Sequence, residues 1–321
     1  MRIPRRTAIS LLALAASAPG ALLAQSWPSR PVRFIVPFPA GGTADLLGRL
    51  AAREMESALG QSVVIDNRAG AGGVIGSDAT AKSTPDGYTL VLSNIASHAI
   101  GPAVYPKLPY DPVKDFTHIG LIAAVPSGIV VAAKSPYKTM ADLLEKARKA
   151  PGTVRFGSNG NGTSSHVQLV LLNRAANVDI THVPYKGTGP ATTDLLAGQI
   201  DGLIAAVPEV GRNPMLRLLA VTSDKRAARW PDVPTVNELG LASVTATNWF
   251  GISGPAGVPA DVADRLNAAL VRGLNTPELT DRLRDLGTEP NRMTRAEYTA
   301  MVVADVARWA EVARSANIHV E

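Results

Sequence analysis

A short apolar strand, a glycine-rich loop and a helix start follow one another three times in this chain. The three loops are Pro39–Thr43, Gly70–Gly73 and Ser158–Thr163. Each loop would leave backbone N–H groups exposed at the positive end of a helix dipole. In an open α/β sheet such loops lie at the carboxyl ends of strands, where ligands bind. The pattern therefore predicts an α/β fold whose backbone holds a small anion.

Strand-like and helix-like segments alternate along the chain, which predicts a mostly parallel sheet covered by helices on both faces. The expected strands are Val32–Val36, Val63–Ile65, Thr89–Leu92, Gly128–Ala132, Val154–Phe156, Ile180–Val183, Gly202–Ile204, Leu216–Val221 and Thr247–Ser253. The expected helices are Thr43–Leu59, Gly73–Lys82, Met140–Lys149, Thr163–Ala176, Pro190–Ala197, Ala260–Leu274, Glu278–Leu286 and Arg295–Ser315.

Two places look like crossings between domains, and a chain of 321 residues is long enough for about two domains. The crossings are expected around Val125–Ser127 and Asn248–Gly251. Residues 26–125 and 250–321 would then form lobe 1, and residues 126–249 would form lobe 2. Two α/β lobes joined by two strands make a hinged clamp of the Venus-flytrap kind, with ligand in the cleft between them.

The first 24 residues read as an export signal. Arg2, Arg5 and Arg6 form a basic region, and Ile9–Leu23 is an apolar run too short to span a bilayer comfortably. We expect cleavage near Ala24 and a periplasmic protein; a retained membrane anchor is the alternative. The arginine pair leaves open whether export is general or of the twin-arginine type.

Charge and composition exclude several classes of function. The formal net charge of +5 includes the three leader arginines, so the remaining chain carries about +2, too little to indicate a nucleic-acid partner. The chain has no cysteine, and its five histidines lack metal-ligand spacing. We therefore expect no metal and no cofactor.

The sharpest motif is the first glycine loop, from Pro37 to Asp45. Its prolines stiffen the strand exit, and Gly41 and Gly42 allow backbone N–H groups to approach a ligand closely. Thr43 or Asp45 could cap the helix that follows. The alternative interpretation is an ordinary turn between a strand and a helix.

The loop from Gly157 to His166 has two interpretations. Its serine, asparagine and threonine groups, together with helix N–H groups, could bind a carboxylate. Alternatively, Ser164 and His166 could serve an exported serine hydrolase, although the segment does not match G-x-S-x-G. The glycine run Gly70–Gly76 has the wrong spacing for a dinucleotide site.

Together these segments resemble the Bug/TctC-type extracytoplasmic receptors of tripartite tricarboxylate transporters. The resemblance spans nearly all of the chain after the leader. It rests on Trp27–Pro31, Pro37–Gly42, Asn67–Gly73, Pro85–Leu90, Tyr105–Pro112, His182–Gly187, Pro231–Thr235 and Trp249–Gly251.

The resemblance implies a two-lobed periplasmic-binding-protein fold, type II-like, that captures a small carboxylate. It also implies delivery to the membrane subunits of such a transporter, and we expect a monomer that is not an enzyme. A periplasmic ligand sensor is a further alternative. From the residues and the resemblance together, the expected ligand-binding residues are Phe38, Gly41, Gly42, Thr43, Asp45, Ser93, Asn94, His98, Ser158, Asn159, Gly160, Thr163, Ser164, Tyr185 and Lys186.

The chain departs from the family pattern at three positions, two of them on lobe 2. Ala205 and Ala206 stand where the family often has Asp and Asn, and Gly101 stands where it often has Asn. With no obvious acid on the lobe 2 wall to pair with an amine, we expect an amine-free carboxylate to be preferred over acidic amino acids. The alternative is that Asp45 or Asp194 faces the cleft and takes this role.

Overall fold

The structure is a computed structural model that describes residues 27–288 and 290–319; the export-signal prediction for residues 1–24 lies outside these ranges. The strands are β1 (Val32–Val36), β2 (Val63–Asn67), β3 (Thr89–Asn94), β4 (Phe116–Ala132), β5 (Val154–Ser158), β6 (Ile180–Pro184), β7 (Gly202–Ala206), β8 (Leu216–Val221) and β9 (Thr247–Pro255). The α-helices are α1 (Thr43–Leu59), α2 (Val74–Ala81), α3 (Gly101–Val104), α4 (Met140–Lys149), α5 (Ser164–Ala176), α6 (Thr188–Ala197), α7 (Val207–Val210), α8 (Ala260–Gly273), α9 (Pro277–Asp285) and α10 (Arg295–Ala316). Short 3-10 turns are η1 (Ala71–Gly73) and η3 (Ala242–Val244), and η2 (Ala96–Ile100) is a π-helix.

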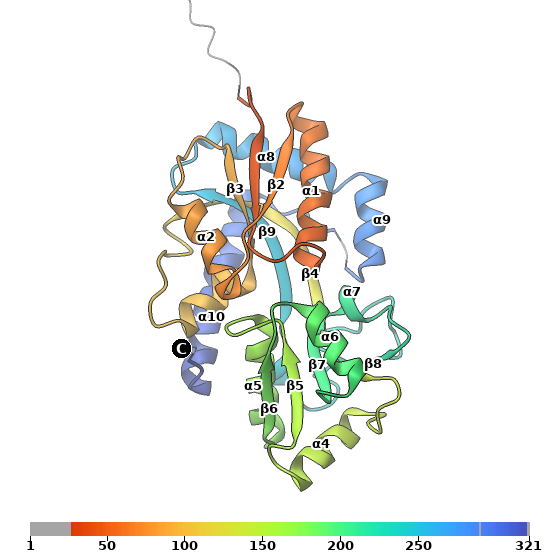
Figure 1. Cartoon of the computed structure of the whole chain (residues 1–321). Helices are drawn as coiled ribbons and strands as arrows, with labels where there is room; N and C mark the ends of the chain where they lie inside the picture. Colours follow the sequence, from red (N-terminus) through yellow and green to blue (C-terminus); the bar gives the residue numbers. More distant parts are fainter. Residues whose placement is uncertain (1–26, 289, 320–321) are drawn as a thin grey trace, which may run out of the picture.

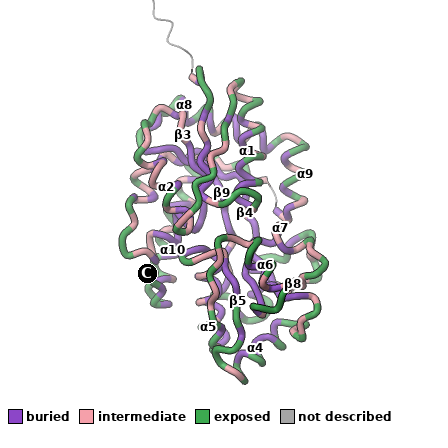
Figure 2. Tube along the Cα trace, viewed as in Figure 1, coloured by how far each residue is buried: buried purple, intermediate pink, exposed green. Residues whose placement is uncertain are grey.

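The strands form two lobes that share β4 (Figure 1). Lobe 1 contains β1, β2 and β3 with α1, α2 and α8, and lobe 2 contains β5 to β8 with α4, α5 and α6. The strand order is β2-β1-β3-β9-β4-β7-β5-β6, and β8 pairs with β4. The strands are buried at the centre of each lobe, and the exposed parts of the trace lie on loops and outer helix faces (Figure 2).

The sheet is mixed, whereas the sequence predicted a mostly parallel one. Parallel pairing holds within each lobe, between β1 and its neighbours β2 and β3, and between β5 and its neighbours β6 and β7. β9 pairs antiparallel with β3 and β4, and β4 pairs antiparallel with β7 and β8. A chain that leaves lobe 1 along one strand must return along another in the opposite direction, and β4 and β9 are those two strands.

Lobe 1 has its own core on the α1 face of the sheet. Leu47 and Met55 of α1 are fully buried in a cluster with Phe34 of β1 and Leu266 and Leu270 of α8. Three- and four-residue spacing puts the buried positions of α1 on one stripe, and Gly60 ends the helix in the left-handed conformation. This packing fixes the N-terminus of α1 at the cleft.

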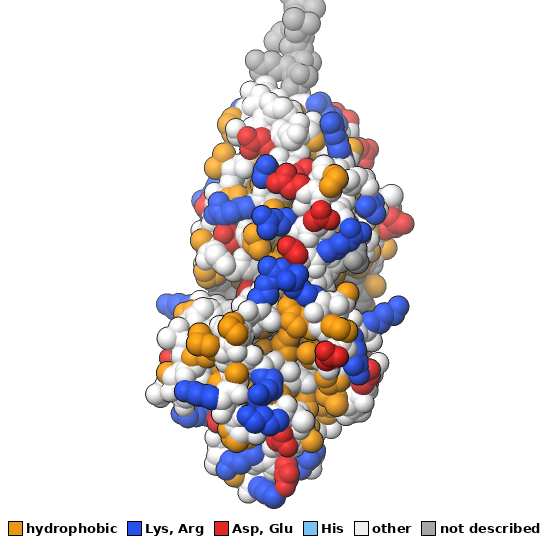
Figure 3. Space-filling model, turned by 90° about the vertical axis from the view of Figure 1, so that its right-hand side faces the viewer, with side chains coloured by type: hydrophobic (Ala, Val, Ile, Leu, Met, Phe, Trp, Pro, Cys, Tyr) orange, Lys and Arg blue, Asp and Glu red, His pale blue; other side chains and the backbone are white. Residues whose placement is uncertain are grey.

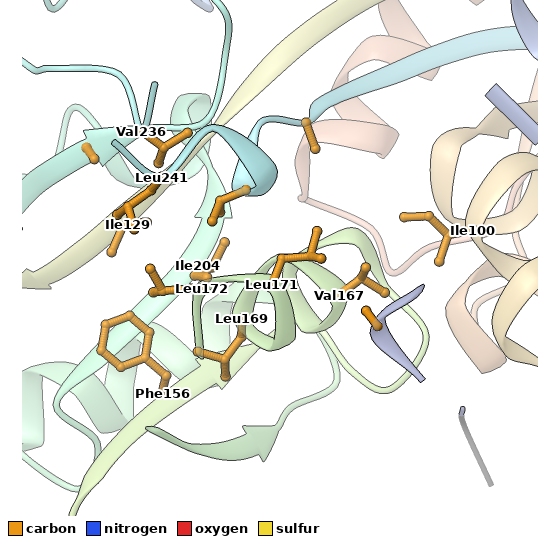
Figure 4. Packing of buried hydrophobic residues seen from close by; sticks show 14 of the residues in the cluster. Ile100, Ile129, Phe156, Val167, Leu169, Leu171, Leu172, Ile204, Val236 and Leu241 are labelled. Carbon is orange, nitrogen blue, oxygen red and sulfur yellow. The ribbon is translucent and has the colours of Figure 1, made fainter. Parts of the chain in front are cut away.

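A second core lies in lobe 2 and continues under α10. α5 places Leu169 and Leu172 on the side of Phe156 of β5, and Val167 lies towards Ile100 (Figure 4). Tyr298, Val302 and Trp309 of α10 belong to the same cluster. α10 contacts η2, α3, β4 and α5, so one helix packs on elements of both lobes. Among the described residues, no helix has the length and apolar character required to cross a membrane.

β4 is the largest difference from the expected elements. It runs for 17 residues from Phe116, although only Gly128–Ala132 was predicted as a strand. Nearly all of it is buried, so its sequence shows no alternation of polar and apolar residues. The predicted boundary between residues 125 and 126 falls inside this continuous strand. By contrast, β1, β8, α1 and α4 have the predicted bounds.

Candidate functional site

A cleft of about 1260 Å³ lies between the lobes, and glycine-bearing loops form most of its wall. Loops 37–44 and 69–73 come from lobe 1, and loops 159–165 and 184–190 come from lobe 2. Each loop precedes or begins a helix, so backbone N–H groups at several helix N-termini face one cavity. Figure 3 shows the waist between the lobes on another face, with Lys and Arg side chains gathered beside it.

The first glycine loop is held in place by Asp45. Gly41 has a φ of +86°, a conformation that a residue with a side chain adopts only under strain. The Asp45 carboxylate accepts hydrogen bonds from the Gly41 amide at 3.0 Å, from Arg49 Nε at 3.0 Å and from Asn67 Nδ2 at 2.9 Å. Burial alone would raise the pKa of Asp45, but these hydrogen bonds and the Arg49 charge outweigh it and lower the pKa.

The N-terminus of α1 has no side-chain cap of its own. Gly42 is the N-cap residue, and its backbone is extended, with a φ of −85°. The Thr43 amide donates instead to Glu209 Oε1 of α7 at 2.7 Å, across the cleft from lobe 2. A carboxylate is therefore already bound at the place where the sequence predicted a carboxylate ligand.

The facing loop of lobe 2 is tied together by its own polar groups. Thr163 Oγ1 donates to the Gly160 carbonyl at 2.6 Å, and the Asn159 amide donates to Ser165 Oγ at 3.0 Å. Asn159 Oδ1 accepts from Thr188 Oγ1 at 3.0 Å, which joins this loop to the start of α6. These internal hydrogen bonds preorganise the loop and use the backbone amides of Asn159, Gly160 and Gly162.

The loop before α6 contributes Tyr185 and Lys186. The Tyr185 hydroxyl donates to Asp194 Oδ2 at 2.7 Å. Burial and the Asp194 carboxylate raise the pKa of Tyr185 to about 12, so the phenol stays protonated. Lys186 is exposed at the cleft wall.

Lys186 and Glu209 are the two charged residues among those described as lining the cleft. The expectation that the lobe 2 wall lacks an acid is therefore wrong. Ala205 and Ala206 do line the wall, but the chain turns into α7 directly after them and presents Glu209. Glu209 is an acid that can pair with a ligand amine, so the wall does not favour an amine-free ligand.

Most of the predicted site residues line the cleft. They are Phe38, Gly41, Gly42, Thr43, Asn94, Asn159, Gly160, Thr163, Ser164, Tyr185 and Lys186. Asp45, Ser93, His98 and Ser158 do not. They lie one layer behind the wall, with side chains that hydrogen-bond to other protein groups: Asp45 to the loop described above, and Ser158 Oγ to His182 Nε2 at 2.6 Å.

Ser93 and His98 belong to a buried polar network under lobe 1. Ser93 Oγ hydrogen-bonds to the Tyr298 hydroxyl and to Ser253 Oγ, both at 2.8 Å, and Ser253 Oγ contacts His118 Nδ1 at 2.9 Å. His98 is fully buried with Nδ1 at 2.8 Å from Ser97 Oγ, and burial and the nearby His118 hold its pKa well below the usual range. Both residues therefore support the wall rather than contact the cavity.

Asn94 both lines the cleft and caps the turn that follows it. Its Oδ1 accepts from the amides of Ala96 and Ser97 at 2.9 and 3.2 Å. Asn94 therefore caps the turn that leads into η2, whereas Ser93 points into the buried network.

The structure does not support the alternative of a serine hydrolase that uses Ser164 and His166. Ser164 Oγ accepts from Gln168 Nε2 at 3.0 Å, and His166 Nδ1 accepts from the Gly162 amide at 3.3 Å. Within the described ranges no hydrogen bond joins Ser164 to His166. The serine–histidine pairs that do form are Ser158 with His182, Ser97 with His98 and Ser253 with His118, and each of these serines is fully buried, out of reach of a substrate carbonyl.

Several cleft residues were not predicted from the sequence. Ser127 and Asn248 line the base of the cleft, where Asn248 Nδ2 donates to Ser127 Oγ at 2.7 Å between β4 and β9. Their only signal was their place in the two predicted crossings. Tyr105 of lobe 1 contacts Asn161 of lobe 2 across the mouth of the cleft. Glu209 lies on a helix of four residues, which is too short to show a periodic pattern in the sequence.

Two α/β lobes joined by antiparallel crossing strands around a cleft lined by glycine-bearing loops define a two-lobed solute-binding receptor. Comparison with known proteins gives the family. The family model described as "Tripartite tricarboxylate transporter family receptor" (TctC) matches residues 47–318. The chain belongs to this family, and it is a binding receptor rather than an enzyme, like the structures to which it is similar.

Three similar proteins cover nearly the whole chain. Protein BugT of Bordetella pertussis is 36% identical over 295 residues, which are 91% of this chain and 90% of BugT. The structure titled "R. palustris Rpa4515 with adipate" has a TM-score of 0.87 at 36% identity and covers 92% of this chain and 100% of that one. "MatC (Rpa3494) from Rhodopseudomonas palustris with bound malate" has a TM-score of 0.84 at 32% identity, covering 89% and 99%.

Proposed function

We propose that this receptor captures a small carboxylate in the cleft between its lobes and delivers it to the membrane subunits of a tripartite tricarboxylate transporter. The observation that carries the proposal is the α1 N-terminus, whose Thr43 amide already holds a carboxylate, that of Glu209. The structures with adipate and malate, at 36% and 32% identity, support the same ligand class.

The chemistry of the wall fits this class of ligand. The first loop offers backbone N–H groups at a helix N-terminus, and the facing loop offers hydroxyl and amide groups near Lys186. A ligand carboxylate would receive charge-assisted hydrogen bonds from both sides, and each contributes roughly 1.5–3 kcal/mol. Glycines at Gly41 and Gly42 let the backbone come close to the ligand oxygen atoms.

The proposed mechanism is capture by closure about β4 and β9. Lobe 1 would comprise residues 26–125 and 250–321 and lobe 2 residues 126–249, and ligand would contact both lobes only when they close. Shifting an open–closed balance from 1:99 to 99:1 takes about 5.5 kcal/mol of differential affinity. Two to four charged hydrogen bonds supply this amount.

The proposed setting is the bacterial periplasm, where the protein acts as a monomer after removal of residues 1–24. The family match supports this setting. The apolar segment in Ile9–Leu23, preceded by arginines, supports export.

Calorimetric titration tests the function directly. Adipate and malate are each compared with the corresponding dimethyl ester. The diacids should bind and the esters should not, because the esters keep the carbon chain and lose the negative charge. Binding of esters and acids with equal affinity, or no binding of any small mono-, di- or tricarboxylate in a wider thermal-shift screen, would contradict the proposal.

A further inference from the structure

We propose that Glu209 is a tethered competitor for the ligand: its carboxylate fills the lobe 1 carboxylate position when no ligand is bound, and an incoming carboxylate must displace it. The inference rests on the proposed function and concerns how this chain sets its affinity. Its starting point is the 2.7 Å hydrogen bond from the Thr43 amide to Glu209 Oε1, made between residues 166 positions apart on opposite lobes.

The way α1 begins explains why a foreign carboxylate is accepted there. α4, α9 and α10 each start at a threonine whose hydroxyl accepts from an amide of its own first turn. α1 starts at Gly42, which has no side chain to do this. A Cβ added at Gly42 would lie 3.4 Å from Glu209 Oε1, which is van der Waals contact, so the carboxylate oxygen sits directly beside the helix start. Unsatisfied amides and a positive helix end favour an anion at this point.

Glu209 is not fully satisfied in this position. Its Oε2 is buried and has no hydrogen-bond partner among the described residues. A buried carboxylate oxygen without a donor opposes the favourable contact made by Oε1. When a ligand takes the Thr43 amide, the Glu209 side chain can turn out to water and regain hydration for both oxygens. The contact is therefore strong enough to form and weak enough to be exchanged.

The segment that carries Glu209 stays docked during such an exchange. Arg212, three residues further on, donates to the carbonyl of Asp285 at the end of α9, and Arg229 pairs with the Asp285 carboxylate at 3.1 Å. These contacts join the α7 segment of lobe 2 to α9 independently of Glu209. Displacement then requires a side-chain rotation of Glu209 and not a rearrangement of α7.

Competition by a tethered group lowers the observed affinity. The apparent dissociation constant equals the intrinsic constant divided by the fraction of molecules in which the Thr43 amide is available. Because the tether keeps Glu209 at high effective concentration, this fraction is small. Removing the carboxylate should therefore tighten binding, opposite to the usual result of removing a polar residue from a binding cleft.

The test compares Glu209→Ala and Glu209→Gln with the wild type by calorimetric titration with adipate and malate. We expect Glu209→Ala to bind at least about tenfold more tightly, and Glu209→Gln to fall between, because a neutral amide oxygen is a weaker competitor. Glu145→Gln, on the exposed face of α4, is the matched control and should bind like the wild type. Circular dichroism checks that each variant is folded.

The Thr43 amide gives a second readout that does not depend on affinity. In ¹⁵N–¹H spectra of the ligand-free protein, its resonance should move upfield in Glu209→Ala, since the charged acceptor is gone. If the wild type binds a diacid and Glu209→Ala binds it equally or less tightly, this inference is overturned and the proposed function is not. Failure of the wild type and all variants to bind any carboxylate would overturn the proposed function, and this inference with it.

Discussion

The Tyr105 hydroxyl of lobe 1 donates to the Asn161 carbonyl of lobe 2 at 3.2 Å and so bridges the mouth of the cleft. The ring passes directly over Gly162, where an added Cβ would lie 2.3 Å from the hydroxyl oxygen. The absence of a side chain at Gly162 is what lets the two lobes come together here.

Replacing this glycine should therefore impair closure. Gly162→Ala would strain the backbone at a φ of +72° and would also push Tyr105 away, so we expect ligand affinity to fall by about tenfold or more. Gly198→Ala is the matched control: its φ is +78°, but nothing lies within 4 Å of the added Cβ. Both variants should lose about 1 kcal/mol of stability in urea unfolding. Equal affinities for the two variants would show that Tyr105 does not limit closure.

A graded series at Gly42 tests the close approach to the α1 N-terminus. The extended backbone at Gly42 accepts a side chain, so Gly42→Ala and Gly42→Val should both fold. The alanine methyl would only touch the bound carboxylate at 3.4 Å, whereas the valine branches would enter its place. We expect binding to be nearly kept in Gly42→Ala and abolished in Gly42→Val by calorimetry. Full affinity in folded Gly42→Val would mean that ligand does not bind at this helix end.

The regular part of the fold is predictable from the sequence because its patterns are local. The stripe of α1 ends at Gly60, and the strand β1 is a short apolar run between turn residues. β4 and η2 escaped prediction because nearly all of their residues are buried. Residues 119–125 of β4 have no polar side chain and so show no period, and a π-helix does not repeat every 3.6 residues.

The candidate site also has a part that local sequence patterns predict and a part that they do not. Loops with paired glycines can be recognised in the sequence, so the segments whose backbone lines the cleft were predicted. What lies across the cleft depends on how the lobes meet, and Glu209 opposite Thr43 is a contact between residues 166 positions apart. No local pattern encodes such a pair. His98 and Ser93 were expected in the cavity because the family resemblance places them there, and Ser93 also because it ends an apolar strand, but their side chains point to the layer behind the wall.

The leader prediction can be checked in the periplasmic fraction. Because Arg2, Arg5 and Arg6 precede an apolar run, mass spectrometry of the exported protein should give a mature chain that begins near Gln25. Changing Arg5 and Arg6 to lysine keeps the charge, so general export would continue, whereas twin-arginine export would stop. Periplasmic protein that still carries residues 1–24 would refute cleavage.

Two buried histidines, His98 and His118, make the stability of the folded protein depend on pH. Burial lowers the pKa of His118 to about 4, whereas an unfolded chain has the ordinary value near 6.5. Between these values the unfolded chain binds more protons than the folded protein, so stability is full above about pH 6.5 and is lost as the pH falls towards 4. One such histidine removes about 1.36 kcal/mol per pH unit, or about 2 kcal/mol between pH 6.5 and 5.

Urea unfolding at pH 7, 6 and 5 measures this dependence. His98 lies with its ring centroid 6.2 Å from that of His118, and its pKa is lowered too, so the wild type should lose stability more steeply than one histidine allows. His118→Gln should reduce the slope by about one proton, because it removes one group that must be charged on unfolding. His319→Gln, at an exposed position, should leave the slope as it is. An unchanged slope in His118→Gln would show that His118 is not held neutral by the fold.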